Sequence, residues 1–357
     1  MDRTRRRLAP QSLLSLLSIL LAALGFLFAV QLLSEAMGLL SPVLRPALQY
    51  RTGGFSLVGV SWLSAYVLLN GSAVAAIALS LFSAELITVT ELFLLVSGSR
   101  LGAAGIVLFV GVLDYARASE YSLSEAVRLG TLAFIVSCSI YVPATVLGVV
   151  ALRWTDVEGW ASGVAVPVRF RSVGFFESLV GMTIDLIGVV PSVIVALALF
   201  VGCLQLFDSQ LERIETEWLQ KRVLVYLQSR WLSFALGLVV TAVTTSVAFS
   251  LGVVVPVYNR GYIERREIVP YVMGASLGTL TDTLLVAVVL ESSTGVTIVF
   301  LLLMVATAST TVALSFYEQY YGLVDDIQRR LLEDRRSFAL FLLLLVAIPL
   351  VLIALPA

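Results

Sequence analysis

Long apolar stretches, separated by short polar segments, make up most of the sequence. A bilayer core is about 30 Å thick, so a run of about 20 apolar residues is long enough to cross it as a helix. Runs of this kind lie at 13–37, 92–113, 130–152, 178–207, 268–290, 295–316 and 338–355. The pattern therefore predicts an all-α polytopic membrane protein.

Two further apolar segments, at about 53–82 and about 231–257, are interrupted near the middle by small polar residues. The interruption is Asn70-Gly71-Ser72 in the first segment and Thr244-Thr245-Ser246 in the second. Irregular backbone at membrane depth is tolerated only where protein buries it or water fills a cavity. We therefore expect each segment to be a re-entrant hairpin, which enters and leaves the membrane on the same face.

A pair of glycine-containing motifs follows these hairpins at a constant offset of 176 positions. Gly98-Ser99-Arg100-Leu101-Gly102 aligns with Gly274-Ala275-Ser276-Leu277-Gly278. Broken helices at corresponding positions of two halves are the best sequence-level indication of a transporter's binding site. The predicted organisation is a single transmembrane domain over 1–357. It contains two inverted repeats, 13–152 with its hairpin at 53–82 and 177–316 with its hairpin at 231–257, and one extra transmembrane helix at 338–355.

Composition agrees with this class of protein and excludes others. Hydrophobic residues make up 59% of the chain and charged residues 13%, with a mean hydropathy of +0.99, whereas a soluble domain has roughly 25% charged residues. The net charge of −1 argues against nucleic acid as a partner. The sequence contains no histidine, Walker loop, nucleophile elbow or zinc motif. We therefore expect neither an enzyme nor a bound cofactor.

The basic residues favour one orientation in the membrane. With the N-terminus inside and both hairpins re-entrant, most of the 23 Lys and Arg residues fall in inside segments, which include 114–128, 259–267 and 318–336. Such a bias is typical of cytoplasmic segments. We expect a multi-pass protein of the cell (plasma) membrane with a cytoplasmic N-terminus. The first hairpin would then enter from the outer face, the second from the inner face, and a polar site would form where they meet.

The two halves resemble the sodium-dependent phosphate cotransporter family of type II symporters. In that family each of two inverted repeats has a Gln-Ser-Ser-Ser tract in a re-entrant hairpin, followed by a Gly-Ala-Asn-Ile-Gly-Thr motif. Here 274–279, Gly-Ala-Ser-Leu-Gly-Thr, is similar to that motif, and 241–246 resembles the approach to the second tract. In the first half, 69–72 and 98–102 occupy the matching places. The resemblance implies secondary active transport of an inorganic anion, with sodium-coupled phosphate symport as the expected activity.

The sequence departs from the family pattern at several positions. Leu69-Asn70-Gly71-Ser72 and Thr245-Ser246-Val247-Ala248 stand where the serine tracts would be. The asparagine of the glycine motif is replaced by Arg100 in one copy and by Ser276 in the other. These changes leave two alternatives open: a transporter of a different anion, or a non-transporting membrane scaffold or regulator with the same fold.

Arg100 and Asp282 are the charged residues of most interest. Ionisable groups inside a membrane are costly, and they are functional-site candidates by default. Arg100 could attract an anion, pair with Asp282, or replace a sodium ion by a fixed positive charge, whereas a structural ion pair would explain both residues without any ligand. Because the two lie at similar depths of the inverted repeats, we expect them to form a salt bridge, direct or through one water, and to line one cavity between the hairpins.

Small polar side chains complete the candidate site. Half-helix ends at 70–72 would present free amides to an anion, and hydroxyls could bind an ion or bond back to their own helix. The candidate substrate- and ion-binding residues are Asn70, Gly71, Ser72, Ser99, Arg100, Thr244, Thr245, Ser246, Ser276, Thr279, Thr281 and Asp282. A sodium ion is expected near Thr245, Ser246 and Asp282. The expected partners are the lipid bilayer, an inorganic anion such as phosphate, and sodium.

Overall fold

A computed structural model gives the fold of residues 5–49, 54–117, 123–154, 156–163, 174–211, 227, 229–247, 250, 254 and 264–354. Over these ranges the secondary structure is helical and contains no strand. Seven helical segments of the described chain, one of them a pair of consecutive helices at 265–289, have the length and apolar composition needed to cross a membrane. The prediction of an all-α polytopic membrane protein is confirmed.

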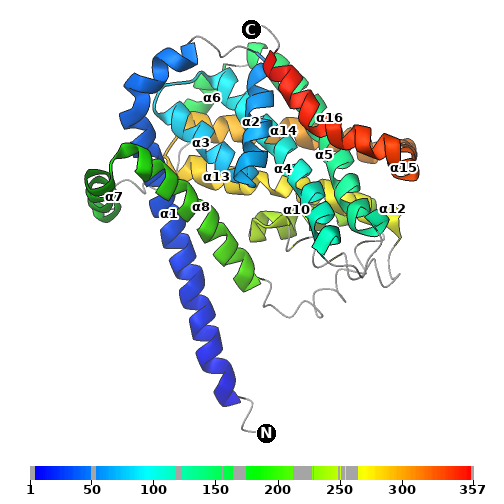
Figure 1. Cartoon of the computed structure of the whole chain (residues 1–357), viewed down its shortest axis with the longest axis horizontal. Coiled ribbons are helices and arrows are strands. Elements are labelled where there is room, and N and C mark those ends of the chain that lie inside the picture. Colours follow the sequence, from blue (N-terminus) through cyan, green and yellow to red (C-terminus); the bar gives the residue numbers. More distant parts are fainter. Residues whose placement is uncertain are drawn as a thin grey trace.

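Figure 1 shows how the helices are arranged. In chain order they are α1 (Arg5–Gln49), α2 (Ser56–Leu68), α3 (Gly71–Ser83), α4 (Val89–Arg117), α5 (Leu123–Trp154), α6 (Val157–Gly163), α7 (Gly174–Ile187), α8 (Val189–Leu211), α10 (Arg230–Thr244), α12 (Arg265–Gly278), α13 (Leu280–Val289), α14 (Ser293–Ser315), α15 (Tyr317–Glu333) and α16 (Arg335–Ala354).

Two helix boundaries differ from the sequence-based prediction. α1 continues through Pro42 and Pro46, beyond the end of the apolar run at 13–37. Proline removes one helical hydrogen bond, but in membrane proteins neighbouring groups can satisfy the freed carbonyl. The segment predicted as one helix at 178–207 is two helices, because Gly188 between α7 and α8 has a φ of +87°, a conformation that glycine adopts without steric cost.

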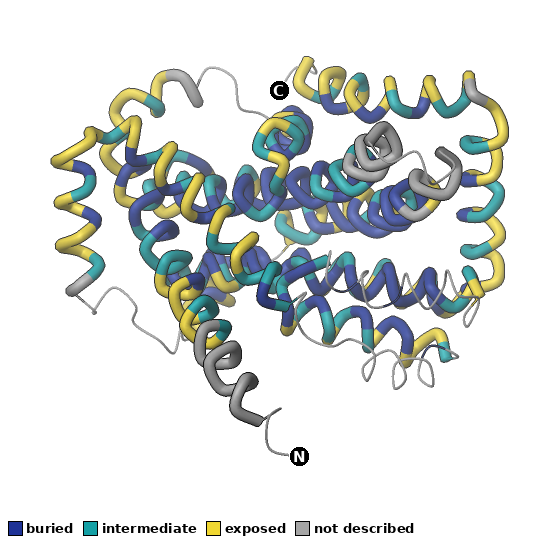
Figure 2. Tube along the Cα trace, turned by 60° about the horizontal axis from the view of Figure 1, so that its bottom comes forward, coloured by how far each residue is buried: buried dark blue, intermediate teal, exposed yellow. Residues whose placement is uncertain are grey.

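The helices differ in how deeply they are buried (Figure 2). α4 and the α12–α13 pair are the most buried spans, whereas α8 and α16 are the least. Large apolar side chains such as Leu186, Ile194 and Leu343 are exposed on the outer helices. A bilayer would cover these surfaces, so α4 and α12–α13 form the centre of the protein.

The first broken segment folds as two short helices, α2 and α3. α2 ends where Leu69 adopts a left-handed conformation with a φ of 50°. Asn70 then begins α3, and its side-chain oxygen accepts a hydrogen bond of 2.9 Å from the Ala73 amide. Each helix has 13 residues, which gives a length of about 20 Å and is too short to cross a bilayer core of about 30 Å.

The packing against α4 shows that α2 and α3 run in opposite directions. Gly98 of α4 lies against Val58 of α2, and Gly102 lies against Trp62, so α2 is parallel to α4. Gly71, the first residue of α3, lies against the middle of α4, and α3 leads through a short loop to the beginning of α4. The chain therefore reverses at the expected break, and its entry into a membrane from one face remains a prediction.

The second half repeats this packing at the same offset of 176 positions. Gly274 of α12 lies against Phe234 of α10, and Gly278 lies against Leu238. Thr245 ends α10 in a left-handed conformation with a φ of 53°, as its counterpart in the first half does. The returning arm of the hairpin expected at 231–257 lies mostly outside the described residues. The shared contacts support an internal repeat, and its inverted orientation remains a prediction.

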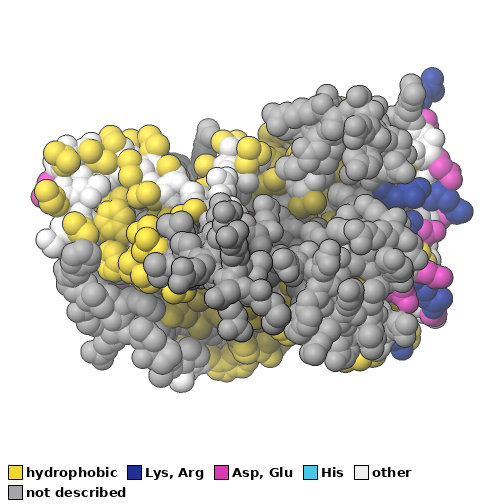
Figure 3. Space-filling view, turned by 90° about the horizontal axis from the view of Figure 1, so that it is seen from below, with side chains coloured by type: hydrophobic (Ala, Val, Ile, Leu, Met, Phe, Trp, Pro, Cys, Tyr) yellow, Lys and Arg dark blue, Asp and Glu magenta, His cyan; other side chains and the backbone are white. Residues whose placement is uncertain are grey.

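Charged side chains gather at one edge of the molecule, next to α15 (Figure 3). Arg265 at the beginning of α12 forms a salt bridge of 2.6 Å with Asp325 of α15. Gln328 of α15 donates a hydrogen bond to the Arg128 carbonyl of α5. The chain segments joined here were all expected on the inside of the membrane, so their meeting at one edge agrees with a common side.

Two prolines inside helices each leave a main-chain carbonyl without its helical donor, and in both cases a tyrosine hydroxyl donates to that carbonyl. Pro349 in α16 leaves the Leu345 carbonyl without its helical donor, and the Tyr66 hydroxyl of α2 donates to this carbonyl at 3.4 Å. Pro270 in α12 has the same effect on the Arg266 carbonyl, to which a tyrosine hydroxyl of α15 donates. These contacts attach α16 and α15 to the centre of the protein.

We expect the Tyr66→Phe substitution to lower the free energy of unfolding by about 1–2 kcal/mol, because the hydroxyl donates to the Leu345 carbonyl and accepts a hydrogen bond of 2.7 Å from Trp62 Nε1. The loss should be smaller in the Pro349→Ala background, where the restored amide of residue 349 satisfies the Leu345 carbonyl. Thermal unfolding of the purified variants in detergent measures both values. An equal loss in the two backgrounds would show that the hydroxyl does not serve this carbonyl.

Candidate functional site

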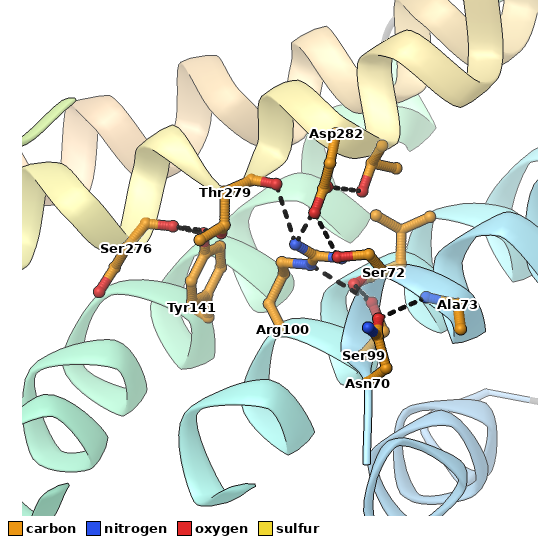
Figure 4. Close-up of polar contacts among 11 residues, drawn as sticks. Asn70, Ser72, Ala73, Ser99, Arg100, Tyr141, Ser276, Thr279 and Asp282 are labelled. Atoms are coloured by element: carbon orange, nitrogen blue, oxygen red, sulfur yellow. Dashed lines mark hydrogen bonds and ion pairs between the residues drawn. The ribbon is translucent and has the colours of Figure 1, made fainter. Parts of the chain in front are cut away.

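The polar centre of the protein lies where α3, α4 and the α12–α13 junction meet (Figure 4). α4 carries Arg100 two residues after Gly98, whose close approach to α2 positions this part of the helix. α12 ends at Gly278 and α13 begins at Leu280, so Thr279 lies between two helices. One turn beyond this break, α13 presents Asp282 toward α4.

Arg100 and Asp282 form a buried salt bridge between the two halves of the chain. The distance from Arg100 Nη1 to Asp282 Oδ1 is 3.5 Å, and the two side chains are only 2% and 5% exposed. The same nitrogen donates to the Thr279 carbonyl at 3.0 Å. The pairing that the sequence predicts for these residues is confirmed. Each charge alone would cost about 2.5–3.5 kcal/mol at the centre of a membrane, and the pairing offsets part of this cost.

Both carboxylate oxygens of Asp282 have hydrogen-bond partners. Ser72, in the first turn of α3, donates its hydroxyl to Oδ2. Thr283 donates to Oδ1 at 3.0 Å. Ser72 therefore joins the tip of the first broken segment to the second half of the chain, and it is the hairpin-tip residue that reaches the ion pair.

The guanidinium of Arg100 retains one free donor. Its Nε lies 3.4 Å from the hydroxyl oxygen of Ser99. Its Nη1 contacts the Thr279 carbonyl and the Asp282 carboxylate. Nη2 is fully buried and has no hydrogen-bond partner among the described residues. An unsatisfied buried donor of this kind is costly, and a bound ion or water is one explanation for it.

A small cavity of ≈ 60 Å³ borders Arg100. Its polar lining comes from Ser137 and Tyr141 of α5, from Ser276 of α12, and from Thr279, which follows α12. Since one water occupies about 30 Å³ in the liquid, the cavity has room for a small polyatomic ion or two waters. The Ser137 and Ser276 hydroxyl oxygens are 3.2 Å apart, and Tyr141 donates to the Ser276 carbonyl at 2.7 Å.

Sequence reasoning missed the contribution of α5 to this cavity. Ser137 and Tyr141 are four residues apart and therefore lie on the same face of a helix. A pair of polar residues at this spacing within the apolar run 130–152 was the available signal. Their neighbours in the run are also serine and cysteine residues, so only packing against α4 and α12 identifies which side chains border the cavity.

Asp282 borders a different pocket from Arg100. It lines an apolar pocket of ≈ 380 Å³ between α1, α8, α10 and α13, together with Thr245. The expectation that Arg100 and Asp282 line one common cavity is therefore wrong. The two cavities lie on different sides of the ion pair, because α4, α5 and α12 line the cavity next to Arg100, whereas α1, α8, α10 and α13 line the pocket next to Asp282.

Several of the predicted hydroxyls bond to nearby backbone groups. Thr244 donates to the Val240 carbonyl at 2.7 Å, and Thr245 donates to the Thr244 carbonyl at 2.7 Å. Ser276 donates to the Val272 carbonyl at 2.9 Å. These are the local bonds that hydroxyl side chains make in membrane helices, and they leave the oxygen atoms able to accept one further bond.

The remaining predicted residues have other positions. Asn70 caps α3, and Gly71 packs against α4, so both shape the hairpin tip. Ser246 follows the break after α10 and is buried, and Thr281 is half-buried on α13. Within the described part of the chain, no hydrogen bond joins Thr281 to the ion pair. The structure thus groups Ser72, Ser99, Arg100, Ser276, Thr279 and Asp282 through hydrogen bonds and the cavity next to Arg100, whereas Thr245 shares only the pocket of Asp282.

Residues 199–322 match the family model described as Na+/Pi-cotransporter. This match supports membership of the sodium/phosphate cotransporter family. The matched region contains α10, α12, α13 and α14, and thus the second glycine motif and Asp282, whereas Arg100 and Ser72 lie outside it. No curated protein and no solved structure matches the chain. The family match and the apolar helices together support a multi-pass membrane protein that is similar in general to sodium-phosphate cotransporters.

Proposed function

We propose that this protein is a secondary active transporter that moves phosphate together with sodium, and that the anion binds in the cavity next to Arg100. The observation that carries this proposal is that Arg100 borders a cavity of ≈ 60 Å³ and has a buried Nη2 atom without a hydrogen-bond partner among the described residues. The family match supports the general class of activity. The cavity next to Arg100 supports the position that we propose for the anion.

The chemistry of the cavity suits a small oxyanion. A guanidinium donates along fixed directions that match phosphate oxygens, and charge-assisted bonds of this kind are about twice as strong as neutral ones. Nη2 supplies the positive donor, and the Ser137 hydroxyl on the facing helix supplies a second donor when it turns from the Ser276 hydroxyl oxygen to the anion. The salt bridge to Asp282 holds the guanidinium in place, so that little ordering is required when the anion binds.

The break after α10 supplies oxygen atoms for a coupling sodium ion. Unwound backbone and the carboxyl ends of half-helices commonly coordinate sodium in transporters. Thr244 and Thr245 stand at such an end, and the left-handed conformation of Thr245 directs the chain away from the helix. This position lies near the pocket that Thr245 shares with Asp282.

The test is uptake of radiolabelled phosphate by the purified protein in proteoliposomes. We expect uptake when an inward sodium gradient is applied and only background uptake with choline in place of sodium. The Ser137→Ala variant should raise the KM for phosphate by about 5- to 10-fold, the effect of losing one hydrogen bond. Ser315→Ala is the matched control, because this exposed serine on α14 bonds only to its own helix.

The possible outcomes separate the competing functions. Sodium-driven uptake of sulfate without uptake of phosphate would assign a different anion to the same site. Uptake of neither anion by a folded, correctly inserted protein would contradict the proposal and favour the membrane scaffold or regulator. An unchanged KM in Ser137→Ala would place the anion outside the cavity next to Arg100.

A further inference from the structure

We propose that the guanidinium of Arg100 occupies a cation-binding position at Asp282, so that no sodium ion binds to this carboxylate in the native protein. The inference deepens the proposed function, on which it rests for the identity of the coupling ion. It assigns sodium coupling to groups other than Asp282. The argument depends on the oxygen atoms that surround Nη1 of Arg100.

These oxygen atoms form a donor set of the kind that binds a small hard cation. Asp282 supplies a carboxylate oxygen, and Thr279, at the end of α12, supplies a main-chain carbonyl. The hydroxyls of Ser72 and Thr283 lie against the same carboxylate. Carboxylate and carbonyl oxygens at the carboxyl end of a broken transmembrane helix are the ligands that sodium takes in secondary transporters.

The guanidinium fills this position in place of a free ion. Nη1 is 3.0 Å from the Thr279 carbonyl oxygen and 3.5 Å from Asp282 Oδ1. Arg100 and Asp282 are both buried, so the tethered charge neutralises a carboxylate that is largely removed from solvent. A sodium ion would have to displace Nη1 and leave two positive charges beside one carboxylate, which is unfavourable in a medium of low dielectric constant.

The two repeats differ at the residue that carries this charge. Arg100 belongs to the first glycine motif, and the equivalent residue of the second motif, 176 positions later, is Ser276. Ser276 is half-buried and its hydroxyl bonds to its own helix. The tethered cation is thus present in only one repeat, and the serine of the other repeat provides the natural substitution for removing it.

We expect the Arg100→Ser variant to gain a sodium site at Asp282. Thermal unfolding is compared in sodium, potassium and choline chloride at equal ionic strength, for the wild type, Arg100→Ser and Arg100→Ser/Asp282→Asn. A ligand that binds only the folded state raises the Tm. Sodium should therefore raise the Tm of Arg100→Ser by about 2–4 °C more than that of the wild type, which corresponds to roughly 1 kcal/mol of linkage. The double variant should lose this additional response.

Other outcomes would overturn the inference. If Arg100→Ser folds and sodium raises its Tm no more than that of the wild type, the vacated position does not accept sodium. If sodium raises the Tm of the wild type but not that of Asp282→Asn, this carboxylate already binds the ion.

Folding itself provides a second readout. If Arg100→Ser is unfolded in choline, sodium should restore its folded yield and potassium should not. Failure of sodium to restore it, while Arg100→Ser/Asp282→Asn folds, would also contradict the proposal. Arg100→Lys retains a tethered cation and should show no additional sodium response. These measurements need no transport, so failed phosphate uptake would contradict the proposed function alone.

Discussion

Replacing Gly274 with alanine should prevent α10 and α12 from packing together and should remove most of the folded protein. A Cβ atom at this position would lie closer than 3.0 Å to the Phe234 carbonyl and to the Leu238 amide. Both are backbone groups, which cannot rotate away as a flexible side chain can. Overpacking in a well-packed core costs about 1–3 kcal/mol, and a clash with rigid backbone should reach the upper end of this range.

Size-exclusion chromatography and thermal unfolding of the detergent-purified variant measure this effect. Gly202→Ala is the matched control, because Gly202 lies within α8 and a Cβ atom there would meet no atom within 4 Å. We expect the control to fold normally and to gain up to about 1 kcal/mol from the helix propensity of alanine. A normal yield of Gly274→Ala would mean that the two helices are farther apart than the structure shows.

The Arg100→Ala substitution should reduce the folded yield more than Arg100→Ala/Asp282→Ala does. The single change leaves the Asp282 carboxylate buried without its counter-ion, and breaking a buried pair in this way costs about 3–5 kcal/mol. The double change removes both charges, and replacing a buried pair by apolar groups is often neutral. The comparison belongs in sodium-free buffer, because sodium is expected to occupy the vacated position.

A double-mutant cycle on the free energy of unfolding tests this coupling. Arg329→Ala is the control, because its ion pair with Asp326 is exposed on α15, and exposed pairs contribute little to stability. Phosphate uptake should be lost in both Arg100 variants, since each removes the free Nη2 donor. Additive losses of stability for Arg100 and Asp282 would show that the salt bridge does not couple them.

Several central features could be predicted before any packing was known. The two breaks at 70–72 and 244–246 follow from small polar residues inside apolar runs, where backbone irregularity must be buried or solvated. The glycine motifs predicted close helix contacts, because small residues let backbones approach. The pairing of Arg100 with Asp282 followed from the cost of leaving either charge alone in a membrane.

Other features depended on information that sequence patterns do not contain. Helix ends in apolar runs have weak local signals, so neither the continuation of α1 through Pro42 nor the break at Gly188 could be predicted. Whether a hydroxyl faces a cavity or bonds to its own helix depends on how the helix is rotated about its axis. The sequence therefore did not distinguish Thr244 and Thr245 from Ser72 as candidate ligands, although only Ser72 reaches the ion pair.

The sequence by itself determined the membrane class, the positions of the broken helices, the repeat offset of 176 positions and the residues that must pair. Each of these follows from composition, spacing or the energetic cost of a charge in an apolar medium. Only the tertiary structure decided that Ser137 and Tyr141 complete a cavity, that Asp282 faces another pocket, and that Nη2 of Arg100 has no hydrogen-bond partner in the described part of the chain. These features arise from contacts among α4, α5, α12 and α13, whose relative rotation and depth are set by packing over the whole protein.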